Sequence, residues 1–233
     1  MADFQYQSLA GKFIVLDGPD GCGKTTQMRL IIDKLEKAAV PVKRLREPGG
    51  TSIGEQIREL LLSVKNEGMD LRCEMLLYMA SRAQLVSQEI RPALARGECV
   101  ISDRYASSTI AYQGGGGGLA TAAIMQVADI AVDGVWPDLT IVFDLDIQAA
   151  MERLNPLHGK AAGTLGLFEA VHMQDRIEQR ESAYFERVRQ SYLQQVEHWP
   201  ERYRKVDASR TVKQVETQVT TVLRDFFGRK RGD

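Results

Sequence analysis

The 233-residue sequence has few cysteines and few histidines, three of each. The cysteines Cys22, Cys73 and Cys99 form neither a CxxC pair nor a dense framework, which excludes a disulfide scaffold and favours a reducing compartment. The histidines are scattered without the spacing of metal ligands, so no zinc site is predicted.

Long hydrophobic runs and surplus charge are lacking too. No apolar run approaches the length of a membrane-spanning helix, and the N-terminus carries Asp3 and no apolar signal-peptide core. Thirty basic and 31 acidic residues leave a net charge of -1, so bulk electrostatics favours neither nucleic acid nor a membrane as partner. We therefore expect a cytoplasmic protein.

Short apolar runs alternate with longer segments of helical periodicity, which predicts an α/β fold. The expected strands cover Lys12–Asp17, Val42–Arg46, Glu98–Ser102, Leu139–Asp144 and Tyr203–Val206. Helices are expected after Gly23 and after Thr51, and over about Leu71–Leu94, Ala120–Val132, Ile177–Val196 and Val212–Phe227. The alternation predicts a five-stranded parallel sheet with helices on both faces, and active sites in such sheets lie beyond the carboxyl ends of the strands.

One glycine-rich motif lies directly between the first strand and the first helix. GPDGCGKT satisfies G-x-x-x-x-G-K-[ST], the phosphate-binding P-loop. Its glycines let several backbone N–H groups point at one phosphate, Lys24 supplies positive charge to the β- and γ-phosphates, and Thr25 offers a hydroxyl ligand to Mg²⁺. The residues expected to bind the nucleoside triphosphate are Gly18, Pro19, Asp20, Gly21, Cys22, Gly23, Lys24, Thr25 and Thr26.

The kind of P-loop protein can be narrowed from what accompanies the motif. The sequence has no Asn-Lys-x-Asp element for guanine, which argues against a GTPase, and 233 residues leave little room for a motor or a transporter module. A small-molecule kinase fits best.

Further motifs make this a specific resemblance. REPGGT at 46–51, the segment 78–82, and DRY at 103–105 followed by AYQG at 111–114 stand in the order found in the thymidylate kinase family, which this sequence resembles from residue 12 to about 210. The resemblance implies a single P-loop nucleoside monophosphate kinase domain over residues 1–233, with the three-layer fold of P-loop NTPases. It also implies transfer of the γ-phosphoryl group of ATP to dTMP, giving dTDP and ADP for dTTP biosynthesis, with Mg²⁺ and as a homodimer.

The end of the third strand carries the predicted phosphate contact of the acceptor. Arg104 is a planar bidentate donor, and the resemblance places it on the acceptor's phosphate. Asp103 either orients Arg104 or holds Mg²⁺-bound water, with a purely structural Asp–Arg pair as the alternative. By resemblance Asp20 reaches the 3′-hydroxyl of the acceptor sugar; otherwise it is a charge at a helix start.

The resemblance also implies a pocket for thymine. Tyr78 and Arg82 share a helix face, with Tyr78 expected to stack on the base and Arg82 to donate to a base oxygen. An aromatic at helical spacing is equally typical of a core. The remaining expected contacts of the acceptor are Arg46, Glu47, Pro48, Ser108, Thr109, Tyr112 and Gln113, with Tyr112 crowding the sugar 2′ position and Glu47-Pro48 a candidate cis peptide.

A lid is expected at about residues 153–176, and it departs from the resemblance. Bacterial members usually carry arginines there, whereas this segment has none between Arg153 and Arg176. Candidates for the transition-state cation are therefore Arg153, Lys160 and Arg176, with Arg176 favoured because it stands in a family-like DRIE run. The predicted catalytic residues are Lys24, Asp103, Arg104 and Arg176, and the predicted metal ligands are Thr25 and Asp103.

Two questions stay open in the sequence. Five consecutive glycines, Gly114–Gly118, either allow close backbone packing or contact a ligand, and the first is favoured. The rival functions are a deoxynucleoside kinase of similar fold and a nucleotide-binding module without turnover. Arg104 favours a phosphorylated acceptor over a nucleoside.

Overall fold

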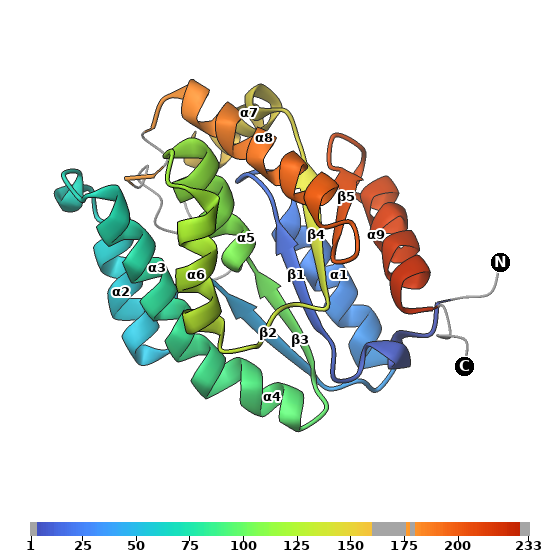
Figure 1. Ribbon diagram of the computed structural model, residues 1–233. Coiled ribbons are helices and arrows are strands. Elements are labelled where there is room, and N and C mark those ends of the chain that lie inside the picture. The colour runs from blue at the N-terminus through green and yellow to red at the C-terminus, as the bar shows by residue number, and fades with distance from the viewer. Residues whose placement is uncertain (1–3, 160–175, 178–179, 229–233) are drawn as a thin grey trace.

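A single five-stranded sheet forms the centre of the computed structural model, which describes residues 4–159, 176–177 and 180–228. The strands are β1 (Phe13–Asp17), β2 (Val42–Arg46), β3 (Cys99–Asp103), β4 (Leu139–Asp144) and β5 (Tyr203–Asp207). All neighbours pair in parallel, in the order β2-β3-β1-β4-β5 (Figure 1). The predicted fold class is confirmed, with strand bounds within one residue of those expected.

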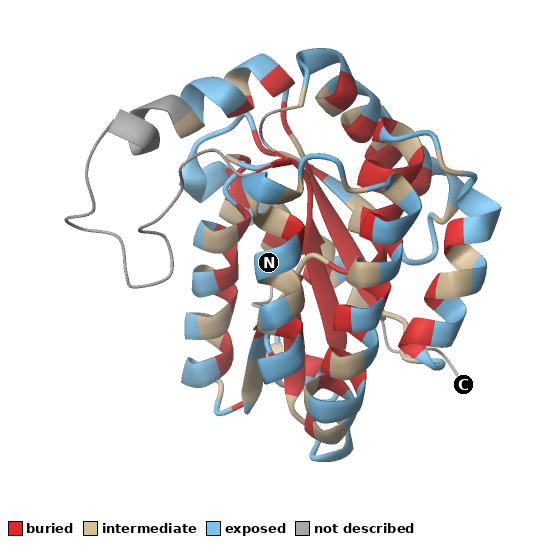
Figure 2. Cartoon of the chain, turned by 90° about the vertical axis from the view of Figure 1, so that its left-hand side faces the viewer, coloured by how far each residue is buried: buried red, intermediate tan, exposed pale blue. Residues whose placement is uncertain are grey.

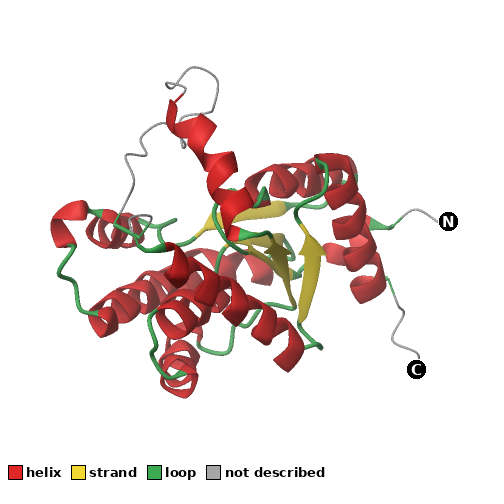
Figure 3. Cartoon of the chain, turned by 90° about the horizontal axis from the view of Figure 1, so that it is seen from above, coloured by secondary structure: helices red, strands yellow, loops and turns green. Residues whose placement is uncertain are grey.

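The helices cover both faces of the sheet, as Figure 3 shows from above. They are α1 (Lys24–Lys37), α2 (Ser52–Leu62), α3 (Leu71–Leu85), α4 (Arg91–Ala95), α5 (Ala106–Thr109), α6 (Thr121–Val132), α7 (Ile147–Gly159), α8 (Ser182–His198) and α9 (Val212–Phe227). Short 3₁₀ turns cover Tyr6–Leu9 and Val64–Asn66, and π-helical segments cover Val86–Ile90 and Ile110–Gly116.

Alternate residues of the central strand serve two different cores. Ile14 and Leu16 pack in the cluster that contains the buried faces of α1 and α9, whereas Phe13 and Val15 pack against residues of α3, α4 and α5. Because side chains of a strand alternate between faces, one continuous apolar run supplies both cores. Figure 2 shows the sheet as the buried layer between half-exposed helices.

Two expected helices differ from the structure in their bounds. The helix expected over Leu71–Leu94 is α3 and α4 joined by the π-helical turn Val86–Ile90. The helix expected from Ile177 begins only at Ser182, because Ile177 lies in a turn and is buried beside the site described below.

The glycine run serves packing between helices. It lies at the end of the π-helical segment Ile110–Gly116, against α8. A Cβ atom on Gly115 would stand 2.4 Å from the Ser191 Cβ atom, and one on Gly116 would stand 2.6 Å from the Tyr184 ring. The preferred prediction for this run, close backbone approach, is therefore confirmed.

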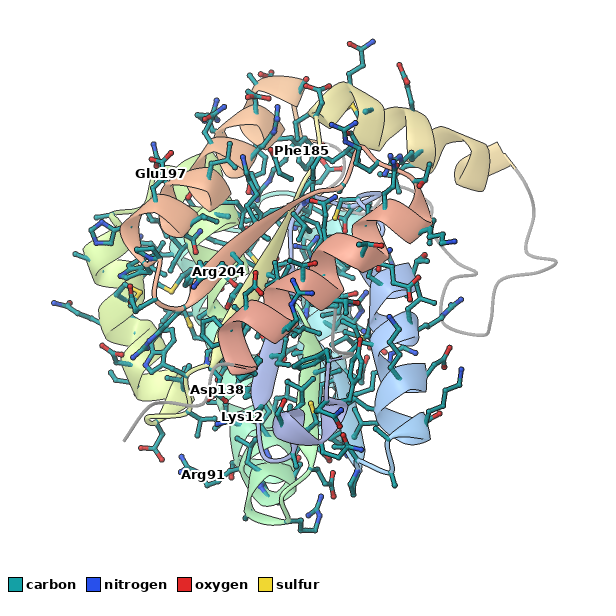
Figure 4. The ribbon with its side chains drawn as sticks, turned by 90° about the vertical axis from the view of Figure 1, so that its right-hand side faces the viewer. Lys12, Arg91, Asp138, Phe185, Glu197 and Arg204 are labelled. Carbon is teal, nitrogen blue, oxygen red and sulfur yellow. The ribbon has the colours of Figure 1, made fainter. Side chains whose placement is uncertain are left out.

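The amino ends of the strands carry ordinary surface ion pairs. Lys12 lies 3.6 Å from Asp138, and Figure 4 labels both residues. Arg91 lies 2.7 Å from Asp133, and all four side chains are substantially exposed. Such pairs contribute little to stability.

Within the described ranges, no helix is both long and apolar enough to cross a membrane.

Candidate active site

The P-loop joins the end of β1 to the start of α1. Gly18, Gly21 and Gly23 have φ angles of +138°, +77° and +91°, a region open mainly to glycine. A Cβ atom on Gly18 would lie 2.5 Å from the Phe143 carbonyl oxygen, so this glycine also allows close contact with β4. The strand–loop–helix context predicted for a phosphate cradle is confirmed.

Lys24 is buried inside this loop. Its Nζ donates to the carbonyl oxygens of Gly18 at 3.0 Å and Pro19 at 2.8 Å, and lies 3.9 Å from Asp20 Oδ1. Burial raises the pKa of the neighbouring Cys22 thiol even though Lys24 opposes the shift, so this cysteine fills space as a neutral thiol.

Asp17, the last residue of β1, is a fully buried carboxylate surrounded by donors. It accepts hydrogen bonds from the hydroxyls of Ser107 at 2.5 Å, Ser108 at 2.8 Å and Tyr192 at 2.6 Å. Arg104 Nη1 lies 3.4 Å away. Burial raises the pKa of the Tyr192 hydroxyl well above its usual value, which keeps it a donor. We call these residues, with Asp17 at the centre, the Asp17 cluster.

Arg104 connects this cluster to the P-loop. Its Nη2 donates to Asp20 Oδ1 at 2.7 Å and to the Tyr112 hydroxyl at 3.2 Å, while Nη1 donates to Ser108 at 3.0 Å. Its φ angle of +72° is an uncommon conformation for a non-glycine residue, and it directs the chain out of β3. Desolvation, the largest single influence, would lower the pKa of Arg104, but Asp20, Tyr112, Tyr192 and Asp17 together outweigh it and hold the pKa well above its ordinary value.

A pocket opens beside this pair at the carboxyl ends of β1, β2 and β3. Its lining residues are Asp20, Glu47, Pro48, Arg58, Leu62, Tyr78, Arg104, Ser108, Thr109, Tyr112, Gln113 and Ile177. Most of the residues predicted to contact the acceptor therefore meet in one cavity. We call it the acceptor pocket.

Two predicted acceptor residues lie outside that lining. Arg82 is almost fully buried, with Nη2 2.6 Å from Glu47 Oε2 and Nη1 3.1 Å from the Thr109 hydroxyl. Arg46 is half-exposed and pairs with Glu55 at 2.9 Å. Both are held at the edge of the pocket, and their contacts with an acceptor stay predictions.

Glu47 follows β2, and its bond to Pro48 is cis, which confirms the expected isomer. Arg82 donates only to Oε2, while Oε1 is buried without a hydrogen-bond partner in the described part of the chain. Burial raises the pKa of the Glu47 carboxyl to about 7, against the opposing effect of Arg82.

Arg176 is placed away from the P-loop. It is buried, donates to the Leu61 carbonyl oxygen at 3.2 Å and forms an ion pair with Glu74, which also accepts from Gln113 at 2.8 Å and Arg180 at 2.7 Å. Of the other two candidate cations, Arg153 donates to the Ala208 carbonyl oxygen at 3.0 Å, and Lys160 lies outside the described residues with most of the expected lid. The identity of the transition-state cation stays a prediction.

Several residues of this site are not predicted from the sequence. In the sequence, Asp17 looks like any polar residue at the end of a strand. Tyr192 looks like any apolar position of an amphipathic helix. Arg58 enters the acceptor pocket from α2 and donates to the Pro48 carbonyl oxygen at 3.1 Å. Its position one helix after REPGGT was the available signal, but spacing alone does not show which face of that helix meets the pocket.

These features define a P-loop protein with an acceptor site next to its phosphate cradle. They are the parallel sheet, the glycine-rich loop ahead of α1, and the pocket that Arg104 connects to that loop. The family model for thymidylate kinase matches residues 16–219. The chain belongs to the thymidylate kinase family.

Individual thymidylate kinases are similar to this chain over almost its whole length. The thymidylate kinase of Pseudomonas putida (strain GB-1) is 41% identical over 224 residues, covering 96% of this chain and 100% of the relative. That of Alcanivorax borkumensis is 41% identical over 218 residues, covering 94% of this chain and 98% of the relative. The crystal structure of thymidylate kinase from Ehrlichia chaffeensis superposes with a TM-score of 0.68 at 31% identity, covering 91% of this chain and 98% of that chain.

Proposed function

We propose that this enzyme transfers the γ-phosphoryl group of ATP to dTMP, giving dTDP and ADP in dTTP biosynthesis. The observation that carries the proposal is the 2.7 Å pair between Asp20 of the P-loop and Arg104 of the acceptor pocket. In this pair the guanidinium of Arg104, a lining residue of the acceptor pocket, bonds directly to the P-loop that would hold the donor phosphates. Phosphoryl transfer depends on such juxtaposition more than on covalent help.

The charges of this region suit two anionic substrates. Lys24 is proposed to bind the β- and γ-phosphates and Arg104 the acceptor phosphate, so that the two positive groups offset the repulsion between the substrates. Asp20 competes for Arg104 and can instead accept from the 3′-hydroxyl of the acceptor sugar once the phosphate engages the guanidinium.

The donor set also fits Mg²⁺. In the described residues no three His, Cys, Asp or Glu side chains gather into a metal site. Mg²⁺ does not need such a cage, because it is commonly held by one or two protein oxygens, waters and substrate phosphates. Thr25 at the start of α1 and Asp103 at the end of β3 are the residues proposed to supply those oxygens. When bound, the ion would neutralise charge on the transferred phosphoryl group.

The pocket walls suit thymine and deoxyribose. Tyr78 lines the acceptor pocket from α3 and is proposed to stack on the base, with Arg82, Ser108, Thr109 and Gln113 as polar contacts. Tyr112 is buried against Arg104 and is proposed to crowd the 2′ position, which selects the deoxy sugar.

A substrate panel tests the assignment. With ATP and Mg²⁺, we expect dTMP to be phosphorylated much faster than dUMP, dCMP, AMP or thymidine. Equal turnover of AMP would refute dTMP specificity, and faster turnover of thymidine would make the protein a nucleoside kinase. Binding of ATP and dTMP without any dTDP would leave a nucleotide-binding module.

We further propose one kinase domain over residues 1–233, with a lid at about 153–176 that brings Arg176 to the phosphates. This requires Arg176 to leave Glu74, since the two are paired in the structure. In the same panel, Arg176→Ala should lower kcat for dTMP by about 10²-fold or more with KM little changed. A lower stability with unchanged kcat would make Arg176 a structural residue.

The outer face of α2 and α3 is the proposed homodimer interface. The sequence suggests Met75, Leu76 and Met79 of α3 for such a face, with core packing as an equal alternative. Met75 and Met79 are buried in the core of the chain itself. Leu76 of α3, together with Ile53 and Leu60 of α2, is between 50% and 52% exposed. Such apolar exposure on two packed helices is typical of a covered surface. Sedimentation should show a dimer that Leu76→Arg dissociates, and a monomeric wild-type chain would rule the interface out.

We also propose that the enzyme is cytoplasmic. All three cysteines are free in the structure, including the exposed Cys73, which suits a reducing compartment. Cell fractionation with an activity assay tests this location.

A further inference from the structure

Glu74 is a fully buried carboxylate on α3 that the proposed reaction does not use. Its Oε1 atom accepts a hydrogen bond from Gln113 Nε2 at 2.8 Å. Its Oε2 atom accepts from Arg180 Nη2 at 2.7 Å and from Arg176. We call these four residues the Glu74 cluster. The cluster joins the π-helical segment Ile110–Gly116, which carries Gln113, to the residues ahead of α8, which carry both arginines.

The hydrogen bond to Glu74 fixes which end of the Gln113 amide is available to a ligand. A carboxylate oxygen accepts, so the amino end of Gln113 faces Glu74 and the carbonyl oxygen, Oε1, is the end left over. Gln113 lines the acceptor pocket. Its Oε1 accepts no hydrogen bond from a described residue, yet it is not closed off from the solvent as Glu47 Oε1 is. Gln113 therefore offers the pocket an acceptor.

The two arginines hold Glu74 in this role. Their positive charges offset the cost of burying a carboxylate, and a guanidinium can only donate, so Oε2 has to accept. Arg180 also donates to the Tyr184 hydroxyl, which in turn donates to the Tyr112 carbonyl oxygen at 2.8 Å. Because Arg180 is held in this way, Glu74 keeps one cation even when Arg176 leaves it, as the proposed lid movement requires.

We propose that the Glu74 cluster selects the base of the acceptor, with Glu74 as a positioning residue that acts through Gln113. Gln113 Oε1 accepts from the N3–H group of thymine. Cytosine has an acceptor at N3, so two acceptors would face each other, and a site built for one hydrogen-bonding pattern strongly rejects the other. This inference rests on the proposed transfer to dTMP and adds the residue that sets the polarity of the pocket.

Glu74→Gln reverses that polarity. The two guanidinium groups can only donate, so the new amide turns its carbonyl oxygen to them and its NH₂ group to Gln113. Gln113 then accepts from position 74 through Oε1 and presents its own NH₂ group to the pocket, where it suits cytosine N3. The ratio of kcat/KM for dTMP to kcat/KM for dCMP should therefore fall by more than about tenfold in steady-state kinetics.

Two variants separate this effect from a loss of packing. Glu74→Asp keeps the charge but shortens the side chain, and Glu36→Gln makes the same chemical change at an exposed position of α1. Both should keep the ratio within about tenfold of the wild type. A merely structural Glu74 would instead lower kcat/KM for both nucleotides alike, and Glu74→Asp would then be at least as harmful as Glu74→Gln because it leaves a cavity.

A swapped variant covers the case in which Glu74→Gln does not fold, since that change leaves buried cations without their partner. Glu74→Gln combined with Gln113→Glu keeps the charge of the cluster. The new carboxylate at position 113 presents an acceptor to the pocket, so the dTMP to dCMP ratio should stay within about tenfold of the wild type.

The outcomes distinguish this inference from the proposed function. A folded Glu74→Gln variant within tenfold of the wild-type ratio, or a swapped variant outside it, would overturn the role of Glu74 while dTMP kinase activity stands. A wild-type enzyme that does not prefer dTMP to dCMP would overturn both.

Discussion

Asp17 and Glu47 are two buried carboxylates at the carboxyl edge of the same sheet, and they are satisfied very differently. Asp17 ends β1 and receives three hydroxyl donors besides its contact with Arg104. Glu47 follows β2 and meets Arg82 through one oxygen, while its other oxygen has no partner in the described structure. Burial alone therefore does not determine how a carboxylate behaves, because the number of donors around it decides whether its charge is stable.

The difference suits the proposed roles of the two arginines. The Asp17 cluster holds Arg104 rigidly with its charge facing the P-loop, as a phosphate contact requires. Glu47 holds Arg82 in the interior, beside the expected position of the base. A series of substitutions tests this contrast.

The largest effect is expected at Arg104. Replacing it in Arg104→Ala removes the link between the P-loop and the acceptor pocket, and kcat/KM for dTMP should fall by about 10²–10³-fold. Arg96→Ala, at an exposed arginine paired with Glu98, is the matched control and should stay within about twofold. Steady-state kinetics measures both, and comparable losses in the two variants would end the special role of Arg104.

The next effect is on stability. Asp17→Asn keeps the shape of the side chain but removes the charge that five donors share, the Gly18 N–H included, and it should lower the free energy of unfolding by about 2–4 kcal/mol. Asp33→Asn, at an exposed position of α1, should change it by less than about 0.5 kcal/mol. Urea unfolding distinguishes them. If both variants are equally stable, the Asp17 cluster does not hold the fold.

The Glu47 carboxyl should make the free energy of unfolding fall as the pH rises, the opposite of the usual effect of a paired carboxylate. Its pKa is raised from 4.5 to about 7 in the folded protein, so the folded state holds this proton more tightly than the unfolded state. Its contribution is complete below pH 4.5 and is lost as the pH rises through 7. In this window the free energy of unfolding should fall by up to about 1.4 kcal/mol per pH unit relative to Glu47→Gln.

Parallel pH profiles for the wild type and Glu47→Gln, measured by urea unfolding, would contradict this expectation. They would also remove the contrast with Asp17, because Glu47 would then be as well compensated.

The smallest effect is expected at Tyr192. Tyr192→Phe deletes one of the donors to Asp17, at 2.6 Å, and should cost about 1–2 kcal/mol of stability, as for a hydrogen bond to a charged group. Tyr6→Phe, whose hydroxyl makes only a 3.5 Å contact with Thr220, should cost less. Thermal or urea unfolding compares the two. An unchanged free energy of unfolding in Tyr192→Phe would show that the remaining donors, Ser107, Ser108, Arg104 and the Gly18 N–H, satisfy Asp17 without Tyr192.

Several features of this protein are predicted by local patterns in its sequence. The apolar run Phe13–Asp17 predicted a buried strand, and GPDGCGKT between that strand and a helical repeat predicted the phosphate cradle. Both are short-range features, in which spacing along the chain is enough to specify backbone conformation and chemistry. REPGGT and DRY with AYQG likewise indicate the family from the sequence alone.

Only the tertiary structure decided which distant side chains meet. The hydroxyl donors of Asp17 come from positions 90 to 175 residues away, and the carboxylate partner of Arg82 lies 35 residues earlier. The strand order β2-β3-β1-β4-β5 brings them together, and no local spacing encodes that order. The sequence by itself thus determined the strands, the phosphate loop and the family. Packing of remote segments decided that Arg104 serves the P-loop and that Arg176 is paired with Glu74, because side-chain contacts depend on how whole elements assemble.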